Sequence, residues 1–353
     1  MTPLYDVPLV HERELTQVNE DERFLGEGGY CLVQKVIWKG KTLARKQLKP
    51  TLGPHHHCVG TRDLATEGAL LAGLQHPNII KVYGVSQSDL QACIMKEEGA
   101  FILLDCLDST LGDRIRQWKR EDEGMPPSSS PCPTTDNKTR TLARQSSGWW
   151  SNLFVNGDAS QCAVWNGLVR QRVPKLLQVA QALAYLHKRG VMYRDLKPDN
   201  IGLDGDGNIR LLDFGLATTS TSSSELAGSR RYMAPEVIRP NAWYTKSVDV
   251  YSFGILLYYV LTLEKPFAKY SGLEHYEKVV EGGERPEIPE WWPKSMQRLV
   301  GQCWSAYPSE RPDMQSIVRT LQRIVRQGER QAMAMEKKQQ QQQRNNRVVP
   351  VQN

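Results

Sequence analysis

Two hydrophobic patterns divide the chain, and the first runs from about Phe24 to Leu104. Its apolar residues form short β-branched or aromatic runs bounded by Gly, Asn and Ser, a pattern typical of strands. One segment, Thr61 to Leu74, instead has leucines near one face at helical spacing. We therefore expect a small sheet with one helix. The expected strands are Cys31 to Trp38, Thr42 to Leu48, Ile79 to Val85, Gln91 to Met95 and Phe101 to Leu104.

The second pattern begins after Val173 and consists of longer segments with helical periodicity around one short strand pair. It predicts a larger, mainly helical part. The expected helices are Lys175 to Lys188, Val248 to Thr262, Lys294 to Cys303 and Pro312 to Arg326, and the expected strands are Ile201 to Leu203 and Ile209 to Leu212.

The stretch between the two patterns, from about Arg120 to Trp165, contains MPPSSSPCPTT and little apolar periodicity. It predicts an inserted flexible segment. Its tryptophans either pack against the helical part or dock a partner, and they are Trp149, Trp150 and Trp165. The five glutamines from Gln339 to Gln343 predict a frayed or disordered end.

The net charge of +6 comes from the C-terminal end of the chain. Between Ser316 and Arg347 there are eight basic and two acidic residues, so the remainder is neutral. Such a run is more often a solvated helix end than a nucleic-acid site, and we expect no nucleic-acid partner.

The seven cysteines contain no C-x-x-C pair, which argues against a disulfide scaffold or a structural zinc site. They favour a reducing compartment, the cytoplasm. The longest apolar stretch, Val250 to Leu263, is too short to span a bilayer and predicts a buried core helix. We therefore expect no membrane span.

Candidate chemistry begins with a glycine-rich string, Leu25-Gly26-Glu27-Gly28-Gly29-Tyr30-Cys31-Leu32-Val33. Its glycines let a turn approach a polyphosphate closely, although such a string alone is a weak signal. The ordered motifs further along the chain make the signal strong: Ala44-Arg45-Lys46, Glu67, Tyr193-Arg194-Asp195-Leu196-Lys197-Pro198-Asp199-Asn200, Asp213-Phe214-Gly215 and Ala234-Pro235-Glu236.

These motifs closely resemble the protein kinase family, from about Phe24 to Arg326. Together with Tyr232 to Glu236, the string from Cys303-Trp304 to Arg311-Pro312 is most similar to the tyrosine-kinase-like group of serine/threonine kinases. The resemblance implies an α+β, two-lobed fold with a five-stranded antiparallel small lobe. The implied boundaries are an extension at 1–19, a kinase domain at 20–328 with lobes at about 20–105 and 106–328 and an insert at about 120–165, and a basic, Gln-rich tail at 329–353.

The resemblance also implies that ATP and Mg²⁺ bind between the lobes. Lys46, positioned by Glu67, would hold the α/β-phosphates, and Asp195 would accept the proton of the substrate hydroxyl. Lys197 would contact the γ-phosphate. Asn200 and Asp213 would bind Mg²⁺. The further residues expected at the nucleotide are Leu25, Gly26, Glu27, Gly28, Gly29, Tyr30, Cys31, Val33 and Ala44, with Leu104 as gatekeeper and the backbone of Asp105 and Leu107 at adenine.

Two further pairings are implied in the large lobe. Asp249 resembles the helix aspartate that anchors the catalytic loop, and Glu236 with Arg311 resembles a buried ion pair.

Two positions depart from the family pattern. Tyr193 replaces a histidine, which we expect to matter only structurally. Cys31 replaces the third glycine of the loop, where its Cβ stiffens the loop. Its thiol is either activated by nearby Lys46 or an unreactive packing substitute.

Two other strings suggest metals but are better explained otherwise. Three histidines, His55 to His57, lie in a Gly/Pro-bounded stretch that we expect to be a solvated loop. The run from Asp204 to Asn208 lacks the later ligands of a calcium loop and predicts a hairpin turn.

The sequence thus predicts an ATP-dependent serine/threonine protein kinase that acts on protein substrates in intracellular signalling. The alternative is a pseudokinase scaffold, supported mainly by Cys31. Tyrosine specificity is disfavoured by Lys197 and Ser229.

Seven consecutive hydroxyl residues, Thr218 to Ser224, come after the Asp213-Phe214-Gly215 motif and predict a mobile segment. In kinases with an arginine before the catalytic aspartate, a phosphate on this segment pairs with it. We expect an upstream kinase or trans-autophosphorylation to order the segment through Arg194, with Arg230 and Arg231 as further partners. The alternative is a soluble linker.

Overall fold

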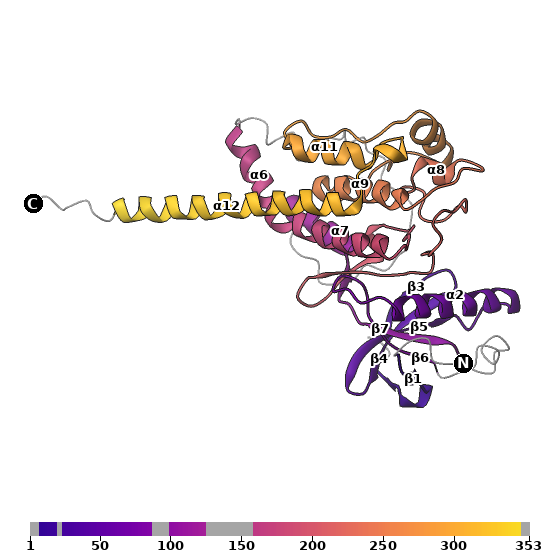
Figure 1. Ribbon diagram of the computed structural model, residues 1–353. Coiled ribbons are helices and arrows are strands. Elements are labelled where there is room, and N and C mark those ends of the chain that lie inside the picture. The colour runs from indigo at the N-terminus through magenta and orange to yellow at the C-terminus, as the bar shows by residue number, and fades with distance from the viewer. Residues whose placement is uncertain (1–6, 20–22, 87–98, 125–157, 347–353) are drawn as a thin grey trace, which may run out of the picture.

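The computed structural model describes residues 7–19, 23–86, 99–124 and 158–346. They form a small lobe around a sheet and a larger helical lobe. The small lobe lies below the larger one in Figure 1. The expected strand at Gln91 to Met95 lies outside the described residues.

The small lobe is built around the hairpin of β4 (Cys31–Trp38) and β5 (Lys41–Leu48). Lys39 and Gly40 join the two strands with φ values of 48° and 73°, the left-handed conformations that a two-residue turn of this kind requires. The strand order is β1-β6-β7-β5-β4-β2, and β3 also pairs with β4. The other strands are β1 (Leu9–Val10), β2 (Thr16–Gln17), β3 (Phe24–Glu27), β6 (Val82–Ser86) and β7 (Phe101–Asp105).

The sheet has more strands than expected, because the N-terminal extension adds to it. β1 pairs parallel with β6 and β2 pairs antiparallel with β4. Strands of two residues carry no measurable periodicity, so the hydrophobic pattern does not reveal them. Val10 is nevertheless fully buried, on a sheet face formed by Val36, Trp38, Leu43, Phe101 and Leu103.

The helix of the small lobe, α2 (Pro54–Ala72), begins seven residues earlier than expected. The three histidines therefore form its first turns, and the expectation of a solvated loop was wrong. Gly53 stands at the N-cap and Pro54 at the first helical position, where its fixed φ favours a helix start.

The large lobe is organised around α9 (Ser247–Thr262), which is buried along almost its whole length. A short sheet of β8 (Ser109–Thr110), β9 (Ile201–Leu203) and β10 (Ile209–Leu211) lies toward the small lobe. The other main helices are α4 (Leu111–Asp122), α6 (Asp158–Gln171), α7 (Val173–Lys188), α11 (Lys294–Cys303) and α12 (Met314–Asn346). Shorter helical segments are η1 (Glu12–Glu14), η3 (Pro198–Asn200), α8 (Pro235–Ile238), α10 (Gly272–Glu274), η4 (His275–Glu281) and η5 (Pro308–Glu310).

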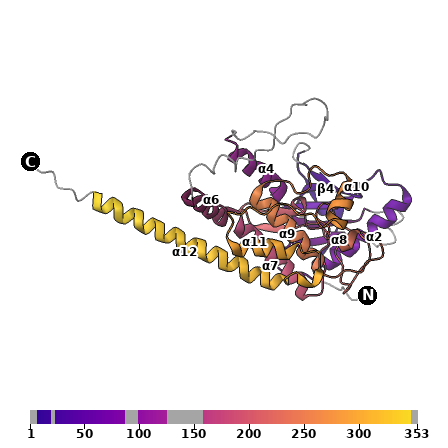
Figure 2. The same cartoon turned by 90° about the horizontal axis from the view of Figure 1, so that it is seen from above.

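Two expectations about irregular segments were wrong. The C-terminal part of the expected insert, residues 158–165, belongs to α6, and Trp165 packs near Trp292 with ring centroids 6.4 Å apart. The glutamine run continues α12, which projects away from both lobes in Figures 1 and 2. Glutamine is a good helix former, so low complexity alone does not end a helix. Trp149 and Trp150 lie outside the described residues.

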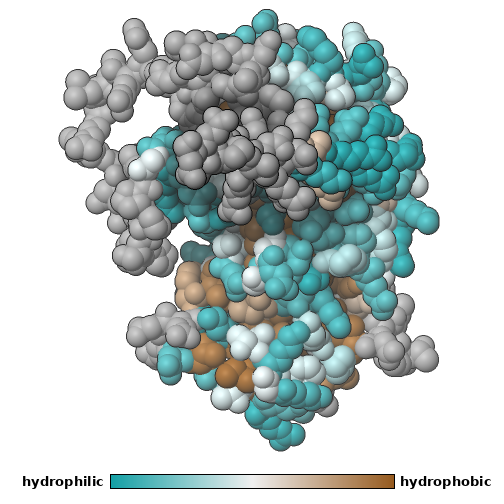
Figure 3. Space-filling view, turned by 90° about the vertical axis from the view of Figure 1, so that its left-hand side faces the viewer, coloured by the Kyte–Doolittle hydropathy of each residue, from teal (hydrophilic) through white to brown (hydrophobic). Residues whose placement is uncertain are grey.

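The lobes join through backbone contacts as well as side chains. The amide of Ile80 donates to the carbonyl of Leu211 at 3.0 Å, and Ile79 forms a bridge with the same residue. In Figure 3, hydrophobic residues gather on the small lobe, whereas the large lobe is mostly hydrophilic on this face. None of the helices within the described ranges is long and apolar enough to cross a membrane.

Candidate active site

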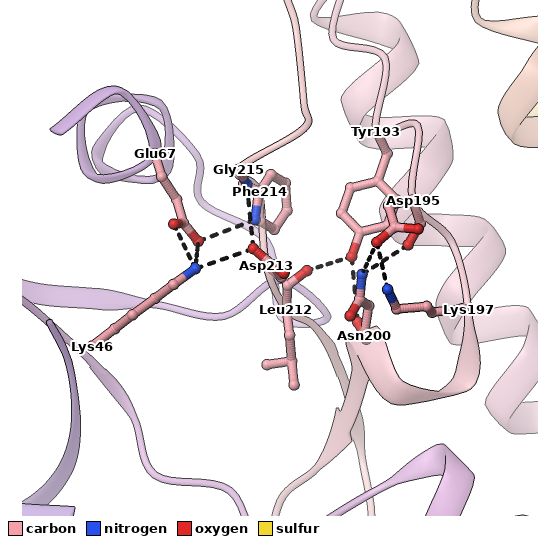
Figure 4. Close-up of polar contacts among 10 residues, drawn as sticks. All are labelled: Lys46, Glu67, Tyr193, Asp195, Lys197, Asn200, Leu212, Asp213, Phe214 and Gly215. Carbon is pink, nitrogen blue, oxygen red and sulfur yellow. Dashed lines mark hydrogen bonds and ion pairs between the residues drawn. The ribbon is translucent and has the colours of Figure 1, made fainter. Parts of the chain in front are cut away.

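The centre of the candidate site is an ion-pair chain between the lobes. Lys46 on β5 points to Glu67 on α2, with Nζ 2.8 and 2.6 Å from the two carboxylate oxygens (Figure 4). The same ammonium lies 3.1 Å from Oδ1 of Asp213. Glu67 also accepts the backbone amide of Phe214 at 3.1 Å. One buried glutamate therefore fixes both the lysine and the Asp213-Phe214-Gly215 motif.

These charges shift one another's pKa. Burial alone would lower the pKa of Lys46, but the carboxylates of Glu67 and Asp213 outweigh burial and raise it above its ordinary value. Burial would raise the pKa of Asp213, but Lys46 lowers it below its ordinary value. Lys46 is therefore a fixed cation and Asp213 a fixed anion at neutral pH.

Asp195 is buried, and its two carboxylate oxygens differ in their contacts with the described residues. Its Oδ2 accepts from Lys197 Nζ at 2.7 Å and from Asn200 Nδ2 at 2.8 Å (Figure 4). Its Oδ1 is buried without a hydrogen-bond partner among the described residues. A buried acceptor without a donor is costly, so this oxygen is poised for a hydroxyl from outside the chain.

Asp249, fully buried on α9, holds the backbone around Asp195. Its oxygens accept the amides of Tyr193 at 2.9 Å and Arg194 at 2.8 Å, and Oδ2 lies 2.8 Å from His187 Nε2. Arg194 has φ of 70°, a left-handed conformation unfavourable for a non-glycine residue. The hydrogen bonds from these two amides to one carboxylate stabilise the turn and so fix the position of Asp195.

Tyr193, where the sequence resemblance leads to the expectation of a histidine, is fully buried. Its hydroxyl donates to the carbonyl of Leu212 and lies 3.4 Å from that of Asn200. Its ring packs edge-on against Phe214, with centroids 5.2 Å apart. Burial raises the pKa of its phenol well above the ordinary value, so the residue stays neutral. These contacts tie the catalytic loop to the Asp213 motif.

Two oxygens remain for a hard cation. The amide nitrogen of Asn200 donates to Asp195, which leaves Oδ1 of Asn200 available. Oδ2 of Asp213 accepts nothing from the described residues. The described part of the chain contains no cluster of three or more His, Cys, Asp or Glu side chains that could form a metal cage. One carboxylate and one amide oxygen suit Mg²⁺, which takes its other ligands from phosphates and water.

The glycine-rich turn is open. An added Cβ would meet no atom within 4 Å at Gly26, Gly28 or Gly29. The amide of Gly28 closes the turn by donating to the carbonyl of Cys31 at 2.8 Å. Tyr30 leaves the turn and stacks on His56 of α2, with centroids 5.8 Å apart. The tip therefore has room for a ligand.

Cys31 begins β4 beside these charges. Burial raises the pKa of its thiol to about 11, and the attraction of Lys46 opposes this shift only in part. The structure therefore favours the unreactive alternative, because the thiolate is the nucleophile.

The hinge segment, residues 104–107, is where adenine is expected, and its backbone groups differ in their availability. Leu104 is buried, and the amide of Asp105 donates to the carbonyl of Lys81 at 3.2 Å. The backbone of Leu107 forms no hydrogen bond with the described residues, while its side chain lies on Gly202 of β9. Leu107 can therefore bind a ligand through its amide and carbonyl, whereas the amide of Asp105 is occupied.

Of the remaining expected residues, Val33 and Ala44 lie near Lys46 in the sheet, whereas Leu25 and Glu27 lie on β3. Val33 pairs with Lys46 in the hairpin, and Ala44 is buried opposite Leu104. Glu27 lies 3.6 Å from Lys49, and Leu25 is partly exposed on β3. Neither Glu27 nor Leu25 contacts the central charges by a hydrogen bond or ion pair.

Two contacts at the site were missed by the sequence reasoning. Arg194 Nη1 lies 2.8 Å from Oε2 of Glu225, and Lys197 Nζ lies 3.0 Å from Oγ of Ser229. Glu225 comes after the hydroxyl run without any motif around it, so no local signal distinguishes it. The identity of Ser229 alone does not reveal its contact with Lys197.

The expected ion pair of Glu236 and Arg311 is present below the site. It is bidentate, at 2.6 and 2.9 Å, and both side chains are buried. Arg311 also donates to the carbonyls of Ser305 and Ser247. The pair thereby joins the end of the Ala234-Pro235-Glu236 motif to the start of α9.

Comparison with known proteins identifies a matching family and several relatives. The model of the protein tyrosine and serine/threonine kinase family matches residues 20–321. A probable serine/threonine-protein kinase of Dictyostelium discoideum is 28% identical over 304 residues, covering 85% of this chain and 27% of that protein.

Two further relatives are similar. The serine/threonine/tyrosine-protein kinase HT1 of Arabidopsis thaliana is 37% identical over 150 residues, 42% of this chain and 38% of that protein. Mitogen-activated protein kinase kinase kinase 7 of Bos taurus is 28% identical over 313 residues, 87% of this chain and 44% of that protein. The chain thus spans less than half the length of each of these relatives.

Proposed function

The chain belongs to the protein tyrosine and serine/threonine kinase family, and on that premise we propose that it transfers the γ-phosphate of ATP to serine or threonine hydroxyls of protein substrates. The tyrosine-kinase-like group, with its role in intracellular signalling, is the best-supported placement, since one similar relative is named as a mitogen-activated protein kinase kinase kinase. A cytoplasmic location is part of the proposal, because Cys31, Cys58, Cys106 and Cys303 are free thiols.

The observation that carries this proposal is the free oxygen of Asp195. A protein hydroxyl that donates to Oδ1 is held for attack, and its proton has an acceptor as the new bond forms. Lys197 and Asn200 hold Oδ2 and so fix the direction in which Oδ1 points. The carboxylate is pre-organised before substrate arrives.

Binding of the nucleotide falls to the groups described on both lobes. When bound, Mg²⁺ neutralises charge on the phosphates of ATP, and Asn200 Oδ1 with Asp213 Oδ2 would hold the ion. Lys46 is fixed as a cation by Glu67 and would orient the α/β-phosphates. The open glycine turn would cover the phosphates, and the backbone of Leu107 would bind the base.

Serine/threonine rather than tyrosine acceptors are favoured by the contact between Lys197 and Ser229. The ammonium bridges Asp195 and Ser229, so the segment that leads to Ala234 lies close to the reacting carboxylate. The space between this segment and Asp195 therefore suits the short side chain of serine or threonine better than that of tyrosine. Two of the three relatives described carry serine/threonine in their names, and one of these, HT1, is named for tyrosine as well.

The test compares the wild type with Asp195→Asn. We expect phosphoserine or phosphothreonine on a generic protein substrate from the wild type and a loss of at least about a hundredfold in the variant. Both proteins should show a thermal shift with Mg-ATP. Asp199→Asn, an exposed aspartate of the same loop, is the matched control.

Equal transfer by the wild type and Asp195→Asn would contradict the role of Asp195. A magnesium-dependent thermal shift without any transfer by the wild type would support the pseudokinase alternative instead.

A further inference from the structure

Two arginines of the large lobe, Arg230 and Arg231, are bonded to backbone carbonyls. Arg230 Nη1 donates to the carbonyl of Gly272 at 3.0 Å, and Arg231 Nη1 donates to the carbonyl of Pro266. Within the ranges that the structure describes, neither guanidinium forms an ion pair. Four other arginines of the lobe each pair with a glutamate: Arg114, Arg194, Arg239 and Arg311.

The backbone of these two arginines directly follows Ser229, which one lysine links to Asp195. Lys197 Nζ contacts Asp195 at 2.7 Å and Ser229 at 3.0 Å, and Arg230 is the next residue along the chain. An extended peptide advances about 3.3 Å per residue. A substrate hydroxyl at Asp195 therefore brings its flanking residues past this segment.

A buried histidine, His275, lies close enough to both arginines for their charges to affect its pKa. His275 is almost fully buried, and neither ring nitrogen has a hydrogen-bond partner among the described residues. Burial lowers its pKa to about 4, and the guanidinium groups of Arg230, Arg231 and Arg285 lower it in the same direction. The arginines therefore make the surroundings of the histidine positive.

The acidic groups of the neighbouring segment are already engaged. Glu274 accepts the amide of Ser271 at 2.9 Å and lies 3.7 Å from Lys278, and Glu284 accepts the hydroxyl of Tyr270. Asp199 is exposed and contributes a negative charge near Tyr232, together with the positive charge of Arg231. No carboxylate of the described chain forms an ion pair with either arginine.

We propose that Arg230 and Arg231 form a recognition site for an acidic or phosphorylated side chain that flanks the acceptor hydroxyl of the substrate. The proposal rests on the proposed kinase function. Guanidinium groups bind carboxylates and phosphates through paired hydrogen bonds, so both anions share one chemistry. Arg230 is exposed and only singly bonded, which makes it the principal contact; Arg231 is half-buried.

The test uses peptides with one serine acceptor in a neutral background. A single Glu, phosphoserine or Gln is placed in turn at the three positions on either side of the acceptor. With phosphatase-treated wild type we expect kcat/KM to be about tenfold higher for Glu than for Gln at one or two positions. Phosphoserine should give at least the same ratio, and raised salt should reduce it.

The ratio of Glu to Gln within each variant is the readout, so a general loss of activity cancels. Arg230→Gln should bring the ratio close to one, and Arg230→Glu should favour Lys over Glu at the same position. Lys246→Gln removes an exposed cation elsewhere on the lobe, beside Asp313, and should keep the wild-type ratio.

Binding of the same peptides to Asp195→Asn, measured by fluorescence anisotropy, separates this inference from the proposed function. Preference for Glu in binding without transfer by the wild type would support the site and contradict the kinase activity. Transfer by the wild type with a ratio near one at all positions would overturn the site and leave the kinase activity standing. A ratio that survives Arg230→Gln and Arg230→Glu would also overturn it.

Discussion

Cys31 illustrates how burial decides the chemistry of a single side chain. With a pKa of about 11, its thiolate fraction at pH 8 is about one in a thousand. We expect iodoacetamide to label it slowly in the folded protein, with a rate that rises about tenfold per pH unit from pH 7.5 to 9. Mass spectrometry of the peptide, with Cys31→Ser for assignment and urea-unfolded protein as reference, measures this. Fast labelling at pH 7.5 that Mg-ATP suppresses would instead show that Lys46 activates the thiol.

The side chain of Leu107 lies against Gly202 and leaves no room there for a Cβ. A Cβ at this position would overlap the Leu107 side chain and lie 3.2 Å from Leu212. We expect Gly202→Ala to cost about 1 to 3 kcal/mol of unfolding free energy and to raise KM for ATP several-fold, because Leu107 is displaced at the hinge. Chemical denaturation and steady-state kinetics measure the two effects.

The matched control for Gly202 is Gly205→Ala, where a Cβ meets only an ordinary contact with Asp108 at 3.5 Å. Adding Leu107→Ala to Gly202→Ala should recover part of the lost stability. If the double variant is no more stable than the single one, the contact with Leu107 is not the cause.

At the scale of elements, the segment after Asp213-Phe214-Gly215 is attached to the large lobe at several points without a phosphate. Thr218 and Met192 exchange backbone hydrogen bonds at 2.9 and 2.8 Å, and so do Ser223 and Tyr244 at 3.0 and 2.8 Å. Arg194 also pairs with Glu225, and the hydroxyl of Tyr244 donates to the carbonyl of Glu225 at 2.7 Å. Glu225 thus binds the arginine that the sequence pattern assigns to a phosphate.

We therefore predict that Glu225→Gln lowers the activity of the dephosphorylated protein by about three- to fivefold, a modest effect because the glutamate is largely exposed. Ser224→Ala, at the neighbouring exposed hydroxyl, should have no effect. Peptide phosphorylation before and after phosphatase treatment measures both. If phosphatase abolishes wild-type activity, phosphorylation by an upstream kinase or in trans is the switch, as the hydroxyl run suggests.

Sequence periodicity predicted several long elements well, but it missed the long helices α4 and α6 and the two-residue strands. The strand at 31–38 and the helix at 294–303 are those of the structure, because eight or more residues repeat their pattern. The two-residue β1 and the histidine turns of α2 carry no such repeat. Local pattern also cannot distinguish a glutamine-rich helix from a disordered tail.

For the candidate site, too, the sequence indicated some residues and not others. Motif order located Lys46, Asp195 and Asp213, because their spacing along the chain is itself the signal. The contacts of Glu225 and Gly202 depend on segments that meet only after folding. No single-chain spacing specifies such contacts.

For the whole molecule, the N-terminal extension completes a face of the small lobe. Val10 has no exposed surface, and Gly84 is a close neighbour that a Cβ would force against it. Glu12 lies 2.7 Å from Arg45, whose side chain is buried. Residues before the family-matched region therefore contribute to the core.

We expect Val10→Ala to lower the unfolding free energy by about 2 kcal/mol, because it leaves a cavity under β6. Leu9→Ala, whose side chain is largely exposed, should change it by less than about 0.5 kcal/mol. Urea denaturation of the two variants measures both. Equal stabilities would mean that the extension is not part of the folded core.

The position of these strands along the chain has a consequence during synthesis. Every strand of the small-lobe sheet ends by Asp105, so the sheet can close while the large lobe is still being translated. Lys46 and Glu67 can then pair on the ribosome well before Asp213 is made. In the growing polypeptide, the charge of Lys46 is then already balanced by Glu67 instead of being buried without a partner. Asp213 later joins this existing ion pair.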